Sequence, residues 1–388
     1  MNSQPRSHQR KRPALAAFIA TFVLVGAGLG GCGSAGSEPD PVWKSPAGSA
    51  PATGPAGKPV EESGQVESIS LSATGDIIMG DAPGKLPAND GKGFFDSVTG
   101  VLKSDFVMGN LEQPLTGDTG TSKCGTPKRP HCFAFRAPPA YAKHLKEAGF
   151  QLLNTANNHS NDYGPQGYRN TVEALEAAGL EHTGAKDQIT VVEVKGVKVA
   201  VVGFSSYKEA NDLNDLKAAA AVVSSAKEKA DLVVVQVHMG AEGAGQTHVK
   251  PGNEIYYSEN RGDPIKFSHT VIDAGADLVV GHGPHVLRAM EFYKGKLIAY
   301  SLGNFAGGGR TLSRDGILKH SGVLHVSLTR EGEYAGGKFV STYLNDAGVP
   351  THEKSDDRGR KMVAELTEAD FPETGAVIES NGTIKPSA

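Results

Sequence analysis

The sequence predicts an α/β fold in which central β-sheets are flanked by helices. Short apolar runs rich in β-branched residues alternate with segments whose apolar residues recur at helical spacing. This alternation is typical of a largely buried central sheet. Polar residues that can carry chemistry follow the apolar runs directly, where the strands of such a sheet would end. No internal repeat of fixed period is visible.

Each expected element has a local reason. Strands are expected in apolar runs within residues 66–76, 105–110, 150–159, 198–206, 231–240, 277–282 and 296–305. Helices are expected in 138–149 and 164–179, which end at Gly149 and Gly179, and in 211–230 and 263–275, which have Asp or Asn near their starts. Residues 320–346 predict two or three antiparallel strands that finish the fold.

The first 32 residues have the pattern of an export signal. A cationic start precedes the apolar stretch "ALAAFIATFVLVGAGLG", and "LGGC" then ends at Cys32. The last motif resembles a bacterial lipobox, in which a lipid-modified cysteine becomes the new N-terminus. We therefore expect a lipid anchor at Cys32 on the extracytoplasmic face of the cell membrane. A cleaved secretory signal and an uncleaved anchor are the alternatives.

Three further regions follow the signal. Residues 33–65 are dominated by Pro, Gly, Ser and Ala, and they predict a flexible tether. Residues 66–371 are expected to form the folded domain, and residues 372–388 a loose tail. The formal net charge of the whole chain is −4. It becomes −8 once the four Lys and Arg residues of the signal are removed, which argues against nucleic acid as a partner.

The cysteines agree with an oxidising compartment. With Cys32 assigned to lipid, Cys124 and Cys132 remain, at the ends of the turn-rich loop "CGTPKRPHC". They predict a disulfide bond. A metal site formed by Cys124, His131 and Cys132 is the alternative.

Carboxylates, imidazoles and amides follow most of the strong apolar runs. The carboxyl ends of the strands in an α/β sheet form the crevice where ligands bind, so these segments are expected to converge. Such a donor set suits one or two divalent ions, with Mn, Zn or Fe as candidates. Two metals about 4 Å apart can stabilise the attacking and leaving oxygens of phosphoryl transfer. The residues concerned are Asp76, Asn110, Glu112, Asn157, Asn158, His159, His238, Glu242, His282, His285 and Asn304.

The order of the motifs resembles the capsule-synthesis protein CapA family over roughly residues 68–305. The motifs are "GDIIMG", "GNLEQPLT", "NTANNHSNDYG", "VHMGAEG", "GHGPHV" and "GKLIAYSLGNF". The resemblance implies a metallophosphoesterase-like sandwich and a role in poly-γ-glutamate or another envelope polymer. It implies metal ligands at Asp76, Glu112, Asn158, His238, His282 and His285. His159 would assist the leaving group, and Asp162, Glu242, Asn110, Asn157 and Asn304 would lie around the ligands and orient them.

The sequence departs from the family pattern at three places. Gly283 stands where the family often has a further histidine, and Met239 stands where it often has an aromatic residue. Asp76 is followed by two isoleucines, so the Asp-x-His opening of many phosphoesterases is absent.

The implied chemistry is hydrolysis of a phosphoester by metal-activated water. The implied partners are an anionic envelope polymer or phosphoester substrate, the membrane, and a polymer synthase or export complex. Two other functions remain open: a non-catalytic accessory protein of polymer export, and a metal-dependent hydrolase of γ-glutamyl amide bonds.

Overall fold

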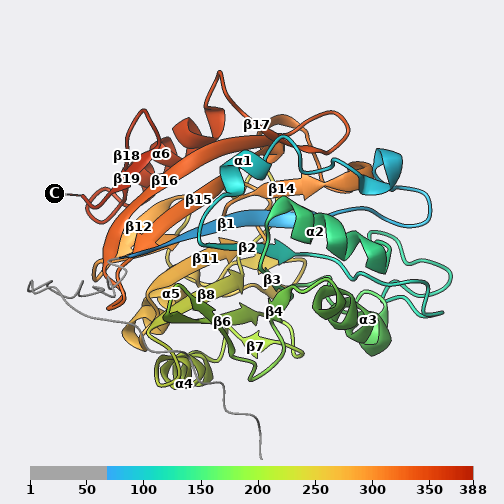
Figure 1. Ribbon diagram of the computed structural model, residues 1–388, viewed down its shortest axis with the longest axis horizontal. Helices are drawn as coiled ribbons and strands as arrows, with labels where there is room; N and C mark the ends of the chain where they lie inside the picture. Colours follow the sequence, from blue (N-terminus) through green and yellow to red (C-terminus); the bar gives the residue numbers. More distant parts are fainter. Residues whose placement is uncertain (1–67, 388) are drawn as a thin grey trace, which may run out of the picture. The chain divides into compact units, whose positions relative to one another are not determined.

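The computed structural model describes residues 68–387, which form two packed β-sheets with helices on their outer faces (Figure 1). The expected signal, Cys32 and the tether at 33–65 lie outside the described residues. Within 68–387, no helix has both the length and the apolar character needed to cross a membrane.

The larger sheet has ten strands within the described residues. Their order is β18 (Val377–Ile378), β19 (Thr383–Lys385), β16 (Tyr334–Leu344), β15 (His320–Leu328), β1 (Ile69–Ile78), β2 (Phe106–Leu111), β3 (Leu152–Asn154) and β4 (Glu181–Thr183), with β14 (Asn304–Gly307) beside β1 and β17 (Pro350–His352) beside β16. Strands β1 to β4 and β14 are parallel, whereas β15 and β16 pair antiparallel, as the sequence predicts.

The smaller sheet has seven strands in the same part of the chain. Their order is β12 (Met290–Tyr293), β13 (Lys296–Ala299), β11 (Leu278–His282), β8 (Leu232–His238), β6 (Val197–Ser205) and β5 (Thr190–Val194), with β7 (Asn211–Asp212) beside β6. A separate hairpin joins β9 (Ile255–Tyr256) and β10 (Glu259–Asn260).

The described helices are short. They are α1 (Thr99–Leu102), α2 (Ala142–Ala148), α3 (Gly164–Ala177), α4 (Leu216–Lys227), α5 (Pro264–Asp273) and α6 (Arg358–Asp370), with 3-10 turns η1 (Ala88–Gly91), η2 (Pro139–Tyr141), η3 (Gly308–Arg310) and η4 (Gly316–Lys319). The side chains of Asp215 and Asp263 accept hydrogen bonds from the first turns of α4 and α5, which explains where these helices begin. Helix α2 ends at Gly149, whose φ of 106° suits glycine.

Side-chain alternation along the strands builds the layers. Leu71 of β1 packs with Val234 of β8 in the core between the sheets. The residues between such positions point outward. Val107 of β2 therefore packs under α2, and Val233 of β8 packs with Phe267 of α5. Both faces of the central strands are covered, which accounts for their continuous apolar runs.

Two expectations differ from the structure. The sequence predicts one strand over residues 296–305, but β13 joins the smaller sheet and β14 the larger, because the chain turns at Gly303 with a φ of 70°. Residues 372–388 were expected to be loose, yet β18 and β19 pair with each other and β19 pairs with β16. The side chains of Ile378 and Ile384 enter the core between the sheets, so the folded domain continues past residue 371.

Candidate metal centre

The candidate site lies where central strands of both sheets end. Asp76 is near the end of β1, and Glu112 follows β2 directly. His238 ends β8 and His282 ends β11, and these two histidines are in register in the parallel pair. His285 follows three residues after β11, in a turn where its φ is 60°. Segments that are far apart in the sequence therefore converge, as predicted.

Asp76, Glu112 and His285 form the centre of this cluster. One ligand atom from each lies within 4.8 Å of the others. His285 Nδ1 is 3.3 Å from Asp76 Oδ2, and His285 Nε2 is 3.5 Å from Glu112 Oε1. His238 Nε2 lies 3.8 Å from Glu112 Oε1, and His282 Nδ1 lies 3.8 Å from Asp76 Oδ1. The two carboxylates are thus surrounded by three imidazoles.

Several buried atoms of this cluster have no hydrogen-bond partner within residues 68–387. They are both carboxylate oxygens of Glu112, both ring nitrogens of His238, and Nδ1 of His282. All three side chains are 0% exposed. Buried polar atoms nearly always have a partner, because leaving one unpaired destabilises the fold. A divalent cation among these atoms would supply the missing partner, and a set of imidazoles and carboxylates suits Zn, Fe or Mn. The residues present therefore fit a metal ion.

Burial also adjusts the protonation of the carboxylates. Burial raises the pKa of Glu112 well above its ordinary value, and His285 opposes this rise whereas Asp76 and Glu242 reinforce it. Burial would raise the pKa of Asp76 too, but the hydrogen bond and charge of His285 hold it below its ordinary value. His285 thus keeps the pKa of Asp76 low, but it does not offset the effect of burial on the pKa of Glu112.

The three histidines also differ in the direction in which their pKa values are shifted. Burial lowers the pKa of His282 to about 4, although Asp76 opposes the change. Burial likewise lowers the pKa of His238 well below its ordinary value. It would lower the pKa of His285 as well, but Glu112 and Asp76 raise it well above that value. His238 and His282 are therefore neutral, the form in which imidazole binds a metal.

Asparagine side chains surround the cluster. Asn110 Nδ2 donates to Asp76 Oδ1 at 2.8 Å. Asn157 Nδ2 donates to Asn110 Oδ1 at 3.1 Å, so Asn157 contacts the cluster only through its neighbour. Asn304 Oδ1 lies 2.8 Å from His285 Nδ1 and fixes that ring. These contacts give Asn110 and Asn304 direct roles in orienting the central residues.

Asn158 and Glu242 lie beside the cluster. Asn158 Nδ2 donates to Glu242 Oε1 at 3.4 Å, while Asn158 Oδ1 is buried without a partner among residues 68–387. Glu242 Oε2 is 3.8 Å from His285 Nε2. Glu242 also pairs with Arg261 Nη2 at 2.8 Å, and Arg261 is only 2% exposed. No local pattern indicates Arg261, because its loop has no apolar periodicity.

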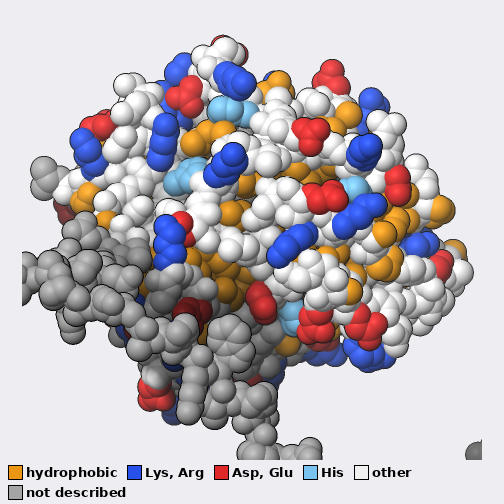
Figure 2. All heavy atoms as spheres, viewed as in Figure 1, with side chains coloured by type: hydrophobic (Ala, Val, Ile, Leu, Met, Phe, Trp, Pro, Cys, Tyr) orange, Lys and Arg blue, Asp and Glu red, His pale blue; other side chains and the backbone are white. Residues whose placement is uncertain are grey.

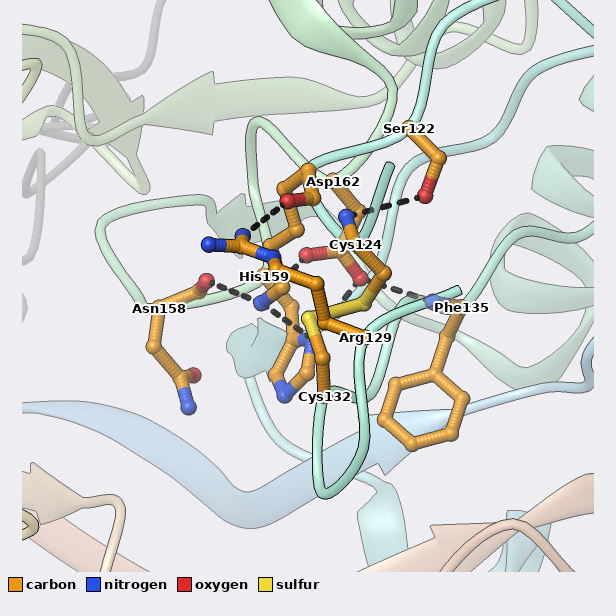
Figure 3. The surroundings of a disulfide bond; sticks show 9 residues. Ser122, Cys124, Arg129, Cys132, Phe135, Asn158, His159 and Asp162 are labelled. Atoms are coloured by element: carbon orange, nitrogen blue, oxygen red, sulfur yellow. Dashed lines mark hydrogen bonds and ion pairs between the residues drawn. A yellow bond between two sulfur atoms is a disulfide. The ribbon is translucent and has the colours of Figure 1, made fainter. Parts of the chain in front are cut away.

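His159 is held from the side of the disulfide loop (Figure 3). Its Nδ1 lies 2.7 Å from Asp162 Oδ2. The other oxygen of Asp162 pairs with Lys123 Nζ at 2.6 Å, and the backbone N–H of Phe135 donates to Asp162 Oδ2 at 2.7 Å. Burial lowers the pKa of His159, and Lys123 adds to this effect whereas Asp162 opposes it. The sequence did not indicate Lys123 or Phe135.

The predicted disulfide is present. Cys124 and Cys132 are bonded and separated by eight positions in the sequence. Lys123 directly precedes this loop, and its Nζ lies 3.2 Å from His159 Nδ1. The bond leaves no thiolate for the alternative metal site with His131.

A cavity of about 280 Å³ opens onto this cluster. His159, Glu242 and His285 line its polar part. Phe133, Phe135, Tyr256, Ile78, Leu312 and Leu318 contribute its apolar walls. Phe133 is 60% exposed, so the apolar wall continues to the surface. The cavity therefore offers a polar floor at the candidate ligands and an apolar entrance.

Comparison with known proteins identifies relatives of the chain. Residues 70–308 match the family model described as bacterial capsule synthesis protein PGA_cap. The capsule biosynthesis protein CapA of Bacillus anthracis is 34% identical over 263 residues, which are 62% of this chain and 60% of that protein. The PGA biosynthesis protein CapA of Bacillus subtilis is 32% identical over 321 residues, which are 77% of this chain and 78% of that protein.

Solved structures are more distant. A putative 5'-nucleotidase from Staphylococcus aureus, solved with alpha-ketoglutarate, has a TM-score of 0.42 at 14% identity. The match covers 78% of this chain and 59% of that chain. The assignment rests on the sequence relatives alone, and it confirms the resemblance that the motifs carry. This chain belongs to the bacterial capsule synthesis protein PGA_cap family, which includes CapA.

Proposed function

We propose that this protein is a metal-dependent hydrolase of phosphoester bonds that acts in the synthesis or export of an anionic envelope polymer such as poly-γ-glutamate. The observation that carries the proposal is the set of buried, unpartnered donor atoms on Glu112, His238 and His282 beside a cavity. The ion, one or two of Mn, Zn or Fe, would be held by Asp76, Glu112, Asn158, His238, His282 and His285. A divalent ion there supplies Lewis acidity and lowers the pKa of water.

The other residues of the site have separate tasks. His159 faces the leaving group and exchanges a proton with it, since Asp162 occupies Nδ1 and no described residue hydrogen-bonds to Nε2. Asp162 stabilises the imidazolium that leaving-group protonation requires, whereas burial and Lys123 oppose it. Asn304 fixes the ring of His285, and the apolar wall keeps bulk water from the polar floor.

The names of the relatives support the biological part of the proposal, because both describe capsule or PGA biosynthesis. We propose that the protein acts on the extracytoplasmic face of the cell membrane, anchored by lipid at Cys32, beside a polymer synthase or export complex. Labelling cells with radioactive palmitate tests the anchor. The natural chain should carry label and Cys32→Ser should not; equal labelling of both would contradict the anchor.

Metal content and hydrolysis test the catalytic proposal. Purified protein is loaded in turn with Mn, Zn and Fe, measured by elemental analysis, and assayed on p-nitrophenyl phosphate and bis-p-nitrophenyl phosphate. His238→Ala and His282→Ala should lose metal and activity. His248→Ala is the matched control, since this side chain is 51% exposed and bonded to Asp370 away from the cluster. Unchanged metal content in the first two variants would contradict the ligand assignment.

The same assay separates the other two functions. A loaded protein that cleaves neither phosphoester but cleaves γ-glutamyl p-nitroanilide is an amide hydrolase. A protein that cleaves none of these substrates has the accessory function. Either result overturns the phosphoesterase proposal.

A further inference from the structure

A second cavity lies next to the metal-centre cavity. It has a volume of about 720 Å³ and is formed by the end of η4, strand β17 and the residues that lead into α6. No residue lines both cavities. Leu318 of η4 lines the metal-centre cavity, and the next residue, Lys319, lines the second one. The two cavities therefore both reach the C-terminal end of η4.

Basic side chains dominate the second cavity. Lys319, Lys354, Arg358 and Lys361 line it. Among residues 68–387, none of these four has a carboxylate oxygen within 4.0 Å, although the adjacent Arg360 pairs with Asp357. Figure 2 shows blue and pale-blue side chains over the part of this face that carries β17 and α6. Four cations without a carboxylate partner among the described residues repel one another, and a bound anion would relieve this repulsion.

The two acidic residues of the lining offset only part of the charge of the four cations. Glu353 Oε2 accepts hydrogen bonds from the backbone N–H of Arg358 at 3.0 Å and of Gly359 at 3.4 Å, so it is used at the start of α6. Asp356 is the other acidic residue of the lining, and its backbone carbonyl accepts from Lys361 Nζ at 2.8 Å. The cavity therefore keeps an excess of positive charge, in a chain whose net charge is negative.

His320 adds a buried polar group to this cavity. The residue is 9% exposed, and its Nδ1 has no hydrogen-bond partner in the described part of the chain. The nearest carboxylate oxygen, on Glu353, is 4.0 Å away. Burial lowers the pKa of His320, and although Glu353 opposes the change, the charges of Lys319 and Arg358 lower it further. An oxyanion beside Nδ1 would provide both the missing hydrogen bond and the compensating charge.

We propose that this cavity is an anion-binding site for a ligand that carries two or more carboxylate or phosphate groups. Lys319, Lys354, Arg358 and Lys361 would pair with the separate oxyanions, and His320 would donate to one of them. The volume and the four cations fit a multivalent anion better than a single small ion. The site is independent of the metal chemistry, because none of its residues belongs to the metal centre.

Calorimetric titration of the full-length protein tests this site. Metal is first removed with a chelator, and the chelator is then removed by dialysis. Citrate and pyrophosphate are titrated separately, so that carboxylate and phosphate ligands are distinguished. Binding of either probe should weaken at least about ten-fold in Lys319→Gln/Arg358→Gln, because two charge-assisted contacts are lost. It should also weaken with rising salt.

The control is Lys217→Gln, an exposed lysine of helix α4, which packs on the smaller sheet. This variant should bind both probes like the natural protein. Lys319 and Arg358 are themselves exposed, so the double variant should keep its thermal midpoint. Absence of binding for both probes overturns the proposal, as does equal binding by the double variant and the control. Neither result bears on phosphoester hydrolysis, which is measured with the metal-loaded protein.

Discussion

Glu112→Gln tests the reasoning about the metal centre most directly. The side chain is 0% exposed, and neither carboxylate oxygen has a hydrogen-bond partner among the residues that the structure describes. Burial raises the pKa of Glu112 well above its ordinary value, which means that this position favours a neutral group. Glutamine has the same shape and no charge. In metal-free protein the substitution should therefore stabilise the fold, while in the presence of metal it should weaken binding of the ion.

The size of the effect follows from the unsatisfied atoms. Leaving a buried polar group unpaired costs about 1–3 kcal/mol, and more if it is charged. For a domain of this size, each 1 kcal/mol of that cost that is relieved raises the melting temperature by about 2–4 °C. Saturation with metal at a hundred times its dissociation constant stabilises the natural protein by about 2.7 kcal/mol, and the variant should gain clearly less.

Glu291→Gln is the matched control. Glu291 is also buried, but its carboxylate accepts hydrogen bonds from Tyr300 at 2.6 Å and Thr374 at 3.0 Å and lies 3.0 Å from His269 Nε2. Burial alone would raise the pKa of Glu291, but these partners lower it. The same substitution should therefore destabilise the fold here, with a fall in melting temperature of about 2–4 °C.

The two variants should also differ in pH dependence. The folded-state pKa of Glu112 is raised, so its contribution to stability is complete below the unfolded pKa and is lost as pH rises through the folded pKa. The advantage of Glu112→Gln should therefore be larger near about pH 8 than near about pH 5. The folded-state pKa of Glu291 is lowered, so its contribution is present above the unfolded pKa and disappears as pH falls.

Calorimetric melting with and without chelator measures both variants. The reasoning is refuted if Glu112→Gln lowers the metal-free melting temperature as much as Glu291→Gln does. It is also refuted if Glu112→Gln binds metal as tightly as the natural protein.

Three further substitutions probe the surroundings of the site. Gly283→Ala should lower metal content, because a Cβ at its φ of 107° would lie 3.0 Å from the ring of His238. Gly295→Ala is the control, because Gly295 also has a positive φ but has open space around it. Both should lose about 1 kcal/mol of unfolding free energy in denaturant, and metal loss in both or in neither would contradict the explanation. Asp162→Asn should lower turnover about 10–100-fold at unchanged metal content, and a matching loss of metal would argue against its role on His159. Cys132→Ser should lower the free energy of unfolding by about 2–3 kcal/mol and make the urea midpoint insensitive to reductant. A midpoint that still changes with reductant would be inconsistent with the disulfide.

The sequence was sufficient to predict which segments meet at the site. His238 and His282 each follow an apolar run, and parallel strands end at the same edge of a sheet, so their register in the structure follows from that rule. The disulfide was equally accessible, because only two cysteines remained for pairing once Cys32 was assigned. These predictions need only the local periodicity of apolar residues and the residue types that follow each apolar run.

Other features depend on contacts that no local pattern encodes. Lys123 and Arg261 lie in irregular loops, and their partners Asp162 and Glu242 are distant in the sequence. The final strand was missed because two or three residues carry too little periodicity, and only the core position of Ile384 reveals it. Tertiary packing selects these contacts, so the sequence alone left the cavity walls unassigned.

The path of the chain between the two sheets has a consequence for the order of assembly. Strands β1 to β4 enter the larger sheet, β5 to β8 and β11 to β13 build the smaller one, and β14 then returns to pair with β1, where Asn304 lies opposite Asp76. The larger sheet supplies Asp76 and Glu112, whereas the smaller one supplies His238 and His282. Neither sheet alone has the full donor set. Tight capture of an ion at this centre would therefore be a late event in folding, and metal uptake during refolding would report that both sheets have come together.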